Sequence, residues 1–364
     1  MTRRRELDFL RGVAIILVLF RHRPLLDFTE MVGWVGVDLF FVLSGFLVSG
    51  LLFREYHKYG DVKPGLFLIR RGFKIYPLYY LTYILYLFPI LYKGKFEWRG
   101  FLTDMLFVQN YFNDWAWAYS ASWSLAVEEH FYIAFAVFAV LGMRSRLVTR
   151  KFLGLLWFEW LVMAMLIAVA LHRALSYGAY SPVHTVTLSH LRIDSMLAGV
   201  LVSCAYHFHG EALPRFYSRF GRVVWVLAFG AIFAAILHEQ MSRFTAVIGF
   251  ALLYVGFAGL LVIFLCDRNI NRKLDRMFSA RVADFVARIG LASYSIYIVH
   301  MFVNYAFTIA MGVAGFELPT ALDFVATSAV SIGTGFWLTR YVETWFLRMR
   351  DRIFPSRASA LPTP

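Results

Sequence analysis

The chain has 364 residues, of which 60% are hydrophobic and 18% aromatic, while only 16% are charged. Soluble domains are roughly 45–50% apolar and about 25% charged, so this composition excludes an ordinary soluble protein and indicates a membrane domain. The net charge of +13 does not indicate a nucleic-acid partner, because the basic residues are scattered among apolar runs. The two cysteines, Cys204 and Cys266, form neither a disulfide framework nor a zinc spacing, so we expect no metal site.

Ten apolar runs approach the length of about 20 residues that a membrane-spanning helix needs. In chain order they cover residues 7–22, 34–53, 73–92, 123–142, 152–171, 190–207, 222–237, 244–266, 291–313 and 321–340. The segment 101–112 is too short to span and is expected to form an interfacial or re-entrant helix. The predicted fold is therefore an all-α polytopic transmembrane helix bundle of about ten spans in residues 1–348, followed by a short disordered tail at 349–364.

The positions of Lys and Arg orient this bundle, because cytoplasmic loops are enriched in both. The basic stretches are 3–5, 54–74, 144–151, 214–222, 267–288 and 348–352. With ten spans they all fall on the side that carries both termini, so we expect both termini in the cytoplasm. The opposite, outer ends of the spans carry tryptophans that fit an aromatic belt. These are Trp34, Trp98, Trp115, Trp117 and Trp123.

Arg11 and His22 both lie in the first predicted span. An ionisable side chain inside a bilayer costs at least about 2.5–3.5 kcal/mol, so each needs a partner, a cavity or a function. Their spacing corresponds to about three helical turns, which puts both on one face, roughly 16 Å apart along the axis. Arg11 falls near the cytoplasmic leaflet, where Asp8 can pair with it, and His22 near the outer surface. A snorkelling Arg11 with an interfacial His22 fits this pattern, and so does a histidine that acts as a general base.

Carboxylates and serines follow in the second and fourth predicted spans. A lone carboxylate such as Asp38 requires a partner within the bilayer, whereas Ser44 and the glycine after it allow a close helix approach. Ser124 and Glu128 stand at positions i and i+4 directly after Trp123 and therefore share a face.

Arg70, Arg71 and Lys74 precede the third predicted span. The enrichment of basic residues on the cytoplasmic side accounts for them. A phosphate clamp accounts for them as well, because Arg makes bidentate phosphate contacts and Lys adds a point charge.

Further charged residues open the sixth span and close the last one. Arg192 and Asp194 are two residues apart and do not face each other on a helix, so each is expected to pair elsewhere in the bundle. Arg340 stands three residues before Glu343 and could pair with it.

Ser293, Tyr297 and His300 follow an i, i+4, i+7 pattern and form one polar stripe, suited to interhelical hydrogen bonds. Polar groups in at least five spans indicate a polar path through the bundle, which suits an enzyme or a transporter of an anionic substrate. A non-catalytic membrane subunit is a further alternative. The residues expected along this path are Ser44, Trp123, Ser124, Arg192, Asp194, Tyr297 and His300.

Six sequence blocks carry a resemblance to a known family. They are ELDFLRGVAIILVLFRH (6–22), VDLFFVLSGFL (37–47), FLIRRGFKIYPLYY (67–80), WSLAVEEHFY (123–132), RIDSMLAG (192–199) and SYSIYIVH (293–300). In this order they resemble the acyltransferase-3 family of integral membrane acyltransferases, and the resemblance covers nearly the whole chain.

The resemblance implies an O-acetyltransferase of the cell inner (plasma) membrane. Its members commonly take an acyl group, usually acetyl, from coenzyme A on the cytoplasmic side. They transfer it to a hydroxyl group of a cell-envelope or exported glycan. The expected partners are therefore acyl-CoA, a glycan or lipid-linked sugar acceptor and the lipid bilayer. A small macrolide-type acceptor and a transporter or flippase of an anionic or sugar substrate remain the alternatives.

The resemblance also assigns roles to the residues of the spans. Arg11 and His22 match the family's Arg-x10-His pattern, and Glu128 matches the acidic position of its WSL motif. We expect His22 to be the general base and Arg11 to position the donor or stabilise negative charge. Glu128 or Asp38 would orient the imidazole, as a carboxylate does in hydrolase triads.

The family's basic motif maps onto Arg70, Arg71 and Lys74, which are expected to hold the phosphates of coenzyme A. Lys74 stands where an arginine is more usual, and a lysine cannot form the bidentate contact.

Overall fold

The structure of the protein is a computed structural model that describes residues 4–357. It is almost entirely helical. The α-helices are α1 (Arg5–His22), α2 (Asp27–Gly33), α3 (Val35–Tyr59), α4 (Pro64–Tyr92), α5 (Trp98–Met105), α6 (Gln109–Phe112), α7 (Trp123–Arg144), α8 (Trp157–Leu175), α9 (Pro182–Thr187), α10 (Ser189–Arg192), α11 (Asp194–Phe208), α12 (Ala212–Ile236), α13 (Phe250–Cys266), α14 (Ile270–Phe278), α15 (Ala280–Leu291), α16 (Ser293–Ala314), α17 (Thr320–Leu338) and α18 (Thr344–Ile353). Short elements are η1 (Ser120–Ser122), η2 (Thr245–Gly249), η3 (Thr339–Glu343) and the strands β1 (Lys151–Phe152) and β2 (Leu155–Leu156).

Eight helical segments of the described residues are long and apolar enough to cross a membrane, so the chain is a multi-pass membrane protein. Two of the ten predicted spans are not among these eight. The helix α1 carries charged residues at positions 5, 6, 8, 11 and 21, and α11 has only 15 residues. The all-α fold is confirmed, whereas the number of spans and the cytoplasmic location of the termini stay predictions.

The structure adds detail to two predicted segments. The fifth span begins at Trp157 instead of residue 152, because residues 151–156 form a hairpin that turns at Gly154 with φ 84°. The helix α18 continues past residue 348 to Ile353, and Arg357 donates a hydrogen bond of 2.8 Å to Glu55. Residues 349–353 are thus helical, the domain boundary at residue 348 stays a prediction, and residues 358–364 lie outside the described part of the chain.

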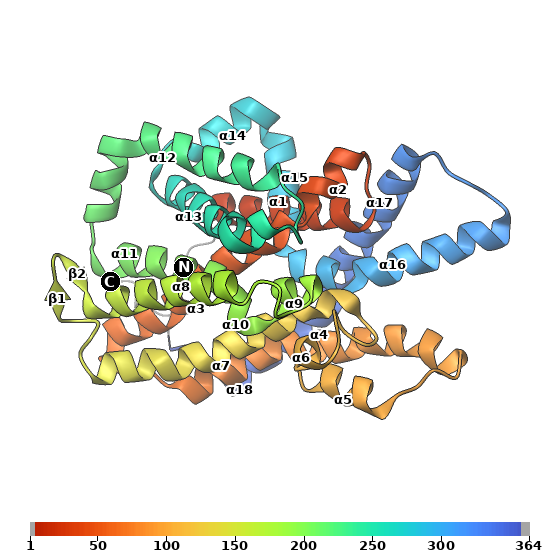
Figure 1. The fold of residues 1–364 in the computed structure, drawn as a ribbon, viewed down its shortest axis with the longest axis horizontal. Helices are drawn as coiled ribbons and strands as arrows, with labels where there is room; N and C mark the ends of the chain where they lie inside the picture. Colours follow the sequence, from red (N-terminus) through yellow and green to blue (C-terminus); the bar gives the residue numbers. More distant parts are fainter. Residues whose placement is uncertain (1–3, 358–364) are drawn as a thin grey trace.

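The helix α1 lies inside the bundle, where it contacts α2, α3, α15 and α16 (Figure 1). Close helix approach depends on glycine, as the pair α3 and α11 illustrates. A Cβ atom on Gly45 would lie 2.0 Å from the carbonyl oxygen of Met196, and one on Gly199 would lie 2.1 Å from that of Val42. The predicted role of the small residue after Ser44 in helix packing is thus confirmed.

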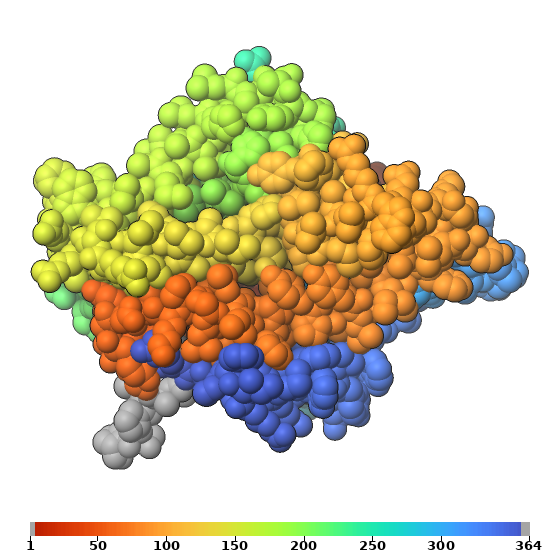
Figure 2. Space-filling model, turned by 90° about the horizontal axis from the view of Figure 1, so that it is seen from below, coloured from red at the N-terminus to blue at the C-terminus, as the bar shows by residue number. Residues whose placement is uncertain are grey.

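The long helices run roughly along the horizontal direction of Figure 1, so its left and right ends correspond to the two predicted membrane faces. The first and last described residues lie at the same end, because Arg4 contacts Tyr206 near the end of α11 and Arg357 contacts Glu55 near the end of α3. On the face drawn in Figure 2, α4 in orange lies between α7 in yellow and the C-terminal helices in blue. The helices α4, α7 and α16 thereby surround a polar interior together with α1 and α3.

Candidate active site

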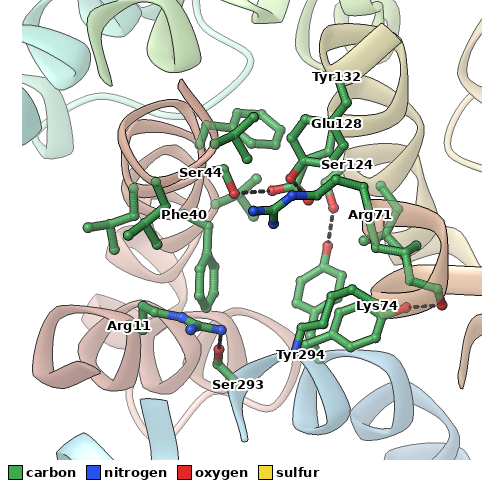
Figure 3. A pocket seen from close by; sticks show the side chains of 18 residues that line it. Arg11, Phe40, Ser44, Arg71, Lys74, Ser124, Glu128, Tyr132, Ser293 and Tyr294 are labelled. Atoms are coloured by element: carbon green, nitrogen blue, oxygen red, sulfur yellow. Dashed lines mark hydrogen bonds between the residues drawn. The ribbon is translucent and has the colours of Figure 1, made fainter. Parts of the chain in front are cut away.

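A cavity of about 150 Å³ lies between α1, α3, α4, α7 and α16 (Figure 3). More than half of the residues that line it carry a polar or charged group. These are Arg11, Ser44, Arg71, Lys74, Ser124, Glu128, Tyr132, Ser293, Tyr294 and Tyr297. Polar residues that repeat at helical spacing project from one face of their helix, as Ser124 and Glu128 do on α7. These faces meet at the cavity.

Glu128 is the carboxylate of this cavity. The Ser44 hydroxyl donates a hydrogen bond of 2.7 Å to Oε1 of Glu128, and the Tyr132 hydroxyl donates one of 2.9 Å to Oε2. The Arg71 side chain reaches toward this group from α4 (Figure 3). The expectation that Ser124 and Glu128 share a face is confirmed, since both line the cavity.

Two further cations, Arg11 and Lys74, line the same cavity. Arg11 donates a hydrogen bond of 3.0 Å to the Ser293 hydroxyl, and Lys74 forms an ion pair with Glu343. The second carboxylate oxygen of Glu343 accepts from Ser295 at 2.8 Å. The predicted pairing of Glu343 with Arg340 is therefore wrong, because the carboxylate points to α4 instead of along its own helix.

Tyr297 lines the cavity on the side of His300, with the two ring centres 5.5 Å apart. Its hydroxyl lies 2.6 Å from Oγ of Ser124 and donates to the Ala121 carbonyl at 2.8 Å. The polar stripe of α16 thus makes the interhelical bonds that its spacing predicted.

His22 does not line the cavity and instead contacts another histidine, His300. Its Nδ1 is 3.0 Å from the Val18 carbonyl oxygen and 3.2 Å from Nε2 of His300, whose own Nδ1 is 2.6 Å from the Tyr297 carbonyl oxygen. A carbonyl oxygen only accepts, so Nδ1 of each ring carries the hydrogen. In neutral His22, the Nε2 atom is therefore left with its lone pair.

The prediction that Asp38 or Glu128 orients the His22 ring is wrong, since both carboxylates bond other residues within the described part of the chain. Asp38 accepts from Arg192 at 2.8 Å and from Ser195 at 2.9 Å, and Glu128 bonds as described above. The partner is His300, which the sequence placed only on a polar path. A histidine seven residues after Ser293 signals a shared face but not the helix that it meets.

Arg192 and Asp194 do not pair with each other, as predicted. Arg192 pairs with Asp38, and Asp194 pairs with Arg173 at 2.6 Å. All four side chains are at most 1% exposed, and none of them lines a cavity described here. Arg173 was not predicted as a partner, because it follows the predicted end of the fifth span by two residues, where a cation is expected in a flanking loop.

A second pocket, of about 400 Å³, which we name the basic pocket, opens where α3 and α18 end and α4 begins. Its basic lining residues are Arg54, Arg70, Arg71, Lys74, Arg350 and Arg357, and its acidic one is Glu55. Arg70 is engaged within the protein, since it bonds the Asp351 carboxylate and the Phe354 carbonyl. Arg71 and Lys74 line this pocket and the buried cavity alike, so the two spaces are neighbours.

Trp123, predicted on the polar path and in the aromatic belt, is 5% exposed and packs edge-on against Phe41 and Trp115. Trp34 is also buried, at 4%, whereas Trp98 is exposed. The belt prediction is therefore wrong for Trp34 and Trp123, which belong to the core. Across residues 4–357, no group of three or more His, Cys, Asp or Glu side chains is placed to hold a metal ion.

The family model described as an acyltransferase domain matches residues 4–340. A protein of Staphylococcus aureus (strain COL) that is provisionally named an O-acetyltransferase is 32% identical over 148 residues, which are 37% of this chain and 24% of the relative. The peptidoglycan O-acetyltransferase OatA of Listeria monocytogenes is 29% identical over 158 residues, or 38% of this chain and 24% of the relative.

The O-acetyltransferase OatA of Staphylococcus aureus (strain NCTC 8325 / PS 47) is 26% identical over 220 residues, which are 56% of this chain and 34% of the relative. The chain thus spans a quarter to a third of the curated relatives that it matches. No solved structure matches it.

Proposed function

The chain belongs to the acyltransferase family, and from this premise we propose that it is an O-acetyltransferase of the cell inner membrane. The acyl group, acetyl, comes from acetyl-CoA on the cytoplasmic side. The acceptor is a hydroxyl group of a cell-envelope or exported glycan, as the names of the matched relatives suggest.

One observation carries the proposal: the basic pocket and the buried cavity share Arg71 and Lys74. Coenzyme A is a phosphate-bearing polyanion with a long, thin arm that ends in the thioester. Arginines are suited to its phosphates because they make charge-assisted, often bidentate hydrogen bonds. A donor bound by the pocket could therefore extend its arm past Arg71 and Lys74 into the cavity.

The cavity offers cationic donors to the thioester. The carbonyl oxygen of the thioester accepts hydrogen bonds, and charge-assisted donors hold it in place. Arg11 is the candidate to position the donor in this way, since a neutral hydroxyl, Ser293, holds it, while Lys74 is already paired with Glu343. Glu128 would balance the positive charge of Arg71 and Arg11.

His22 is the general base. Its Nε2 lone pair takes the proton of the acceptor hydroxyl, whose oxygen then forms the bond to the acyl carbon. The carbon–sulfur bond breaks, and the thiolate leaves as coenzyme A after protonation by the imidazolium. Since Arg11 and His22 are three turns apart on α1, the thioester at the end of the donor's arm must pass the Ser124–Tyr297 contact to reach the acceptor.

His300 is the positioning residue for this base. Its Nδ1–H is fixed by the Tyr297 carbonyl, so its Nε2 accepts from Nδ1–H of His22. This bond does for His22 what the carboxylate of a hydrolase triad does: it selects the tautomer and orients the ring.

The test is transfer of radiolabelled acetyl from acetyl-CoA to membrane-associated glycan by the purified chain in proteoliposomes. We expect covalent label on the glycan, and a loss on the order of 10³-fold in His22→Ala and about 10²-fold in Arg11→Ala. His184→Ala, which changes a partly exposed histidine of α9, is the matched control.

Label that crosses the membrane without bonding to glycan would identify a transporter instead. Wild-type transfer by correctly inserted His22→Ala and Arg11→Ala proteins would refute the assigned roles.

A further inference from the structure

A third pocket, of about 350 Å³, lies at the end of the bundle opposite the basic pocket. It is formed by the end of α4, the middle of α16 and the loop that leads into η1, toward the right of Figure 1. Most of its lining side chains are aromatic or basic, among them Tyr86, Tyr119, Phe302, Tyr305, Lys93 and Lys95. Two lysines and no carboxylate of the described residues line it. We name it the outer pocket.

The aromatic wall of the outer pocket is fixed by backbone hydrogen bonds. The rings of Tyr86 and Tyr119 stack with centroids 4.4 Å apart and planes 15° apart. The Tyr86 hydroxyl donates to the Ile298 carbonyl at 2.6 Å and accepts from the Phe302 amide at 3.2 Å, and the Tyr119 hydroxyl donates to the Tyr297 carbonyl. The hydroxyls therefore point into the protein. The Tyr119 ring is only 2% exposed and backs the Tyr86 ring, which forms the aromatic wall together with Phe302 and Tyr305.

This arrangement differs from an interfacial belt, in which tyrosines turn their polar end to the headgroups. The loop that carries Tyr119 is also held from beneath. The Asp104 carboxylate accepts from the amides of Trp117 and Ala118 at 3.1 and 2.9 Å and from the Tyr83 hydroxyl at 3.0 Å. A wall held in this way loses little conformational entropy when a ligand binds.

The outer pocket adjoins the candidate active site. Tyr297 lines the buried cavity, and its carbonyl oxygen accepts hydrogen bonds from Tyr119 of the outer pocket and from His300 of the histidine pair. Met301, which lines the outer pocket, directly follows His300 in the chain. One layer of side chains around Tyr297 thus separates the outer pocket from the buried cavity and from His22, the proposed base.

We propose that the outer pocket binds the glycan acceptor and that this acceptor carries an acidic group. Aromatic faces suit the apolar face of a sugar ring, and a pocket with few convergent polar groups is typical of ligand sites. Lys93 and Lys95 are exposed and complement a carboxylate or phosphate, and the Lys93 ammonium lies 5.8 Å from the centre of the Tyr305 ring. The assignment rests on the proposed function and adds the acceptor's position and charge.

The experiment measures binding of tetragalacturonate, an acidic tetrasaccharide, to the full chain in phosphatidylcholine nanodiscs. Its carboxyl-reduced form, a neutral galactose tetramer, is the matched ligand. We expect the neutral tetramer to bind with at least about fivefold lower affinity. Lys93→Gln/Lys95→Gln lowers the affinity for tetragalacturonate by a similar factor, since exposed ion pairs are individually weak. Tyr305→Ala, at a side chain 39% exposed, weakens both ligands.

The control is Arg150→Gln/Lys151→Gln, which removes two exposed charges at the opposite end of the bundle and leaves binding unchanged. Equal affinity for the two tetramers, or unchanged binding in either pocket variant, overturns the assignment. Displacement of the sugar by phosphatidylglycerol in the nanodisc overturns it too, because the pocket would then be a lipid site.

No acyl donor is present in this assay, so the two proposals fail separately. A chain that binds the acidic tetramer but acetylates no glycan refutes the proposed function and leaves the outer pocket standing. Acetylation that is unaffected by the pocket variants refutes the outer pocket alone.

Discussion

Charged side chains lie inside the bundle in two regions, and the two regions differ in what their charges face. In the first, which we name the ion-pair core, Arg192 pairs with Asp38 and Arg173 pairs with Asp194. The two guanidinium groups also lie over the Phe250 ring, at 3.7 and 4.8 Å from its centre. The charges there face each other and an aromatic ring, and these four residues line none of the pockets described above.

In the buried cavity, by contrast, the charges face a space. Glu128 accepts from two neutral hydroxyls, Arg11 donates to another, and Arg71 lies over the Tyr132 ring with its carbon 5.9 Å from the ring centre. Ionisable groups inside a membrane are expensive to keep. Charges that neutralise one another hold helices together, whereas charges that line a cavity are available to a ligand. The sequence treats both regions alike, as polar residues within spans.

The largest effect is expected in the ion-pair core. Asp38→Leu leaves Arg192 buried without its counter-charge and destabilises the protein by about 3–5 kcal/mol, measured by thermal unfolding in detergent. Asp38→Leu/Arg192→Met removes both charges and restores stability together with acetyl transfer.

A stable double variant that transfers no acetyl group would break the comparison, since Asp38 would then belong to the chemistry.

Glu128→Gln tests the opposite side of the comparison. The amide keeps the shape of the side chain and an oxygen that accepts from Ser44 or Tyr132. The free energy of unfolding therefore changes by less than about 1 kcal/mol. Loss of the charge beside Arg71 lowers the rate of acetyl transfer on the order of 10²-fold.

Glu159→Gln, at a carboxylate of α8 that bonds His209 outside the cavity, is the control and retains the rate. A Glu128→Gln protein that unfolds early but transfers normally would move Glu128 to the structural group.

His300 distinguishes positioning from packing. His300→Leu removes the nitrogen that accepts the hydrogen bond from His22. We expect kcat to fall about tenfold and the KM for the glycan to stay unchanged, since only the orientation of the base is lost. His300→Gln places an amide oxygen where Nε2 stood and recovers most of kcat.

Equal loss in the two variants, or a loss that follows the amount of folded protein, would assign His300 to packing alone.

The smallest effects separate two neighbouring arginines of the basic pocket. Arg71→Gln raises the KM for acetyl-CoA about tenfold, because a charge-assisted hydrogen bond contributes about 1.5 kcal/mol or more. Arg70→Gln raises it only about twofold, since Asp351 and the Phe354 carbonyl already engage that guanidinium.

The measurement is initial rate against acetyl-CoA concentration at saturating acceptor. A larger increase of this KM in Arg70→Gln than in Arg71→Gln would show that Asp351 and Phe354 release Arg70 when the donor binds.

Much of the fold follows from the sequence. The apolar runs place most helices within a few residues, because a spanning helix needs a fixed length of apolar side chains. The exceptions have local causes, such as the hairpin turn at Gly154 and the polar but helical end of α18. Helical spacing also predicts that Ser124 and Glu128 share a face, and both line the cavity.

The choice of partners was decided only by the tertiary structure. Spacing along one helix gives the direction of a side chain about that helix's axis, but it does not tell which helix lies opposite. For this reason the sequence offered Arg340 for Glu343 and a carboxylate for His22, where the bundle brings Lys74 and His300. For the same reason the sequence predicted that Asp38 needs a partner but did not identify Arg192 as that partner. Composition and periodicity determined a polar helix bundle, and the packing of its helices determined which polar groups surround a cavity.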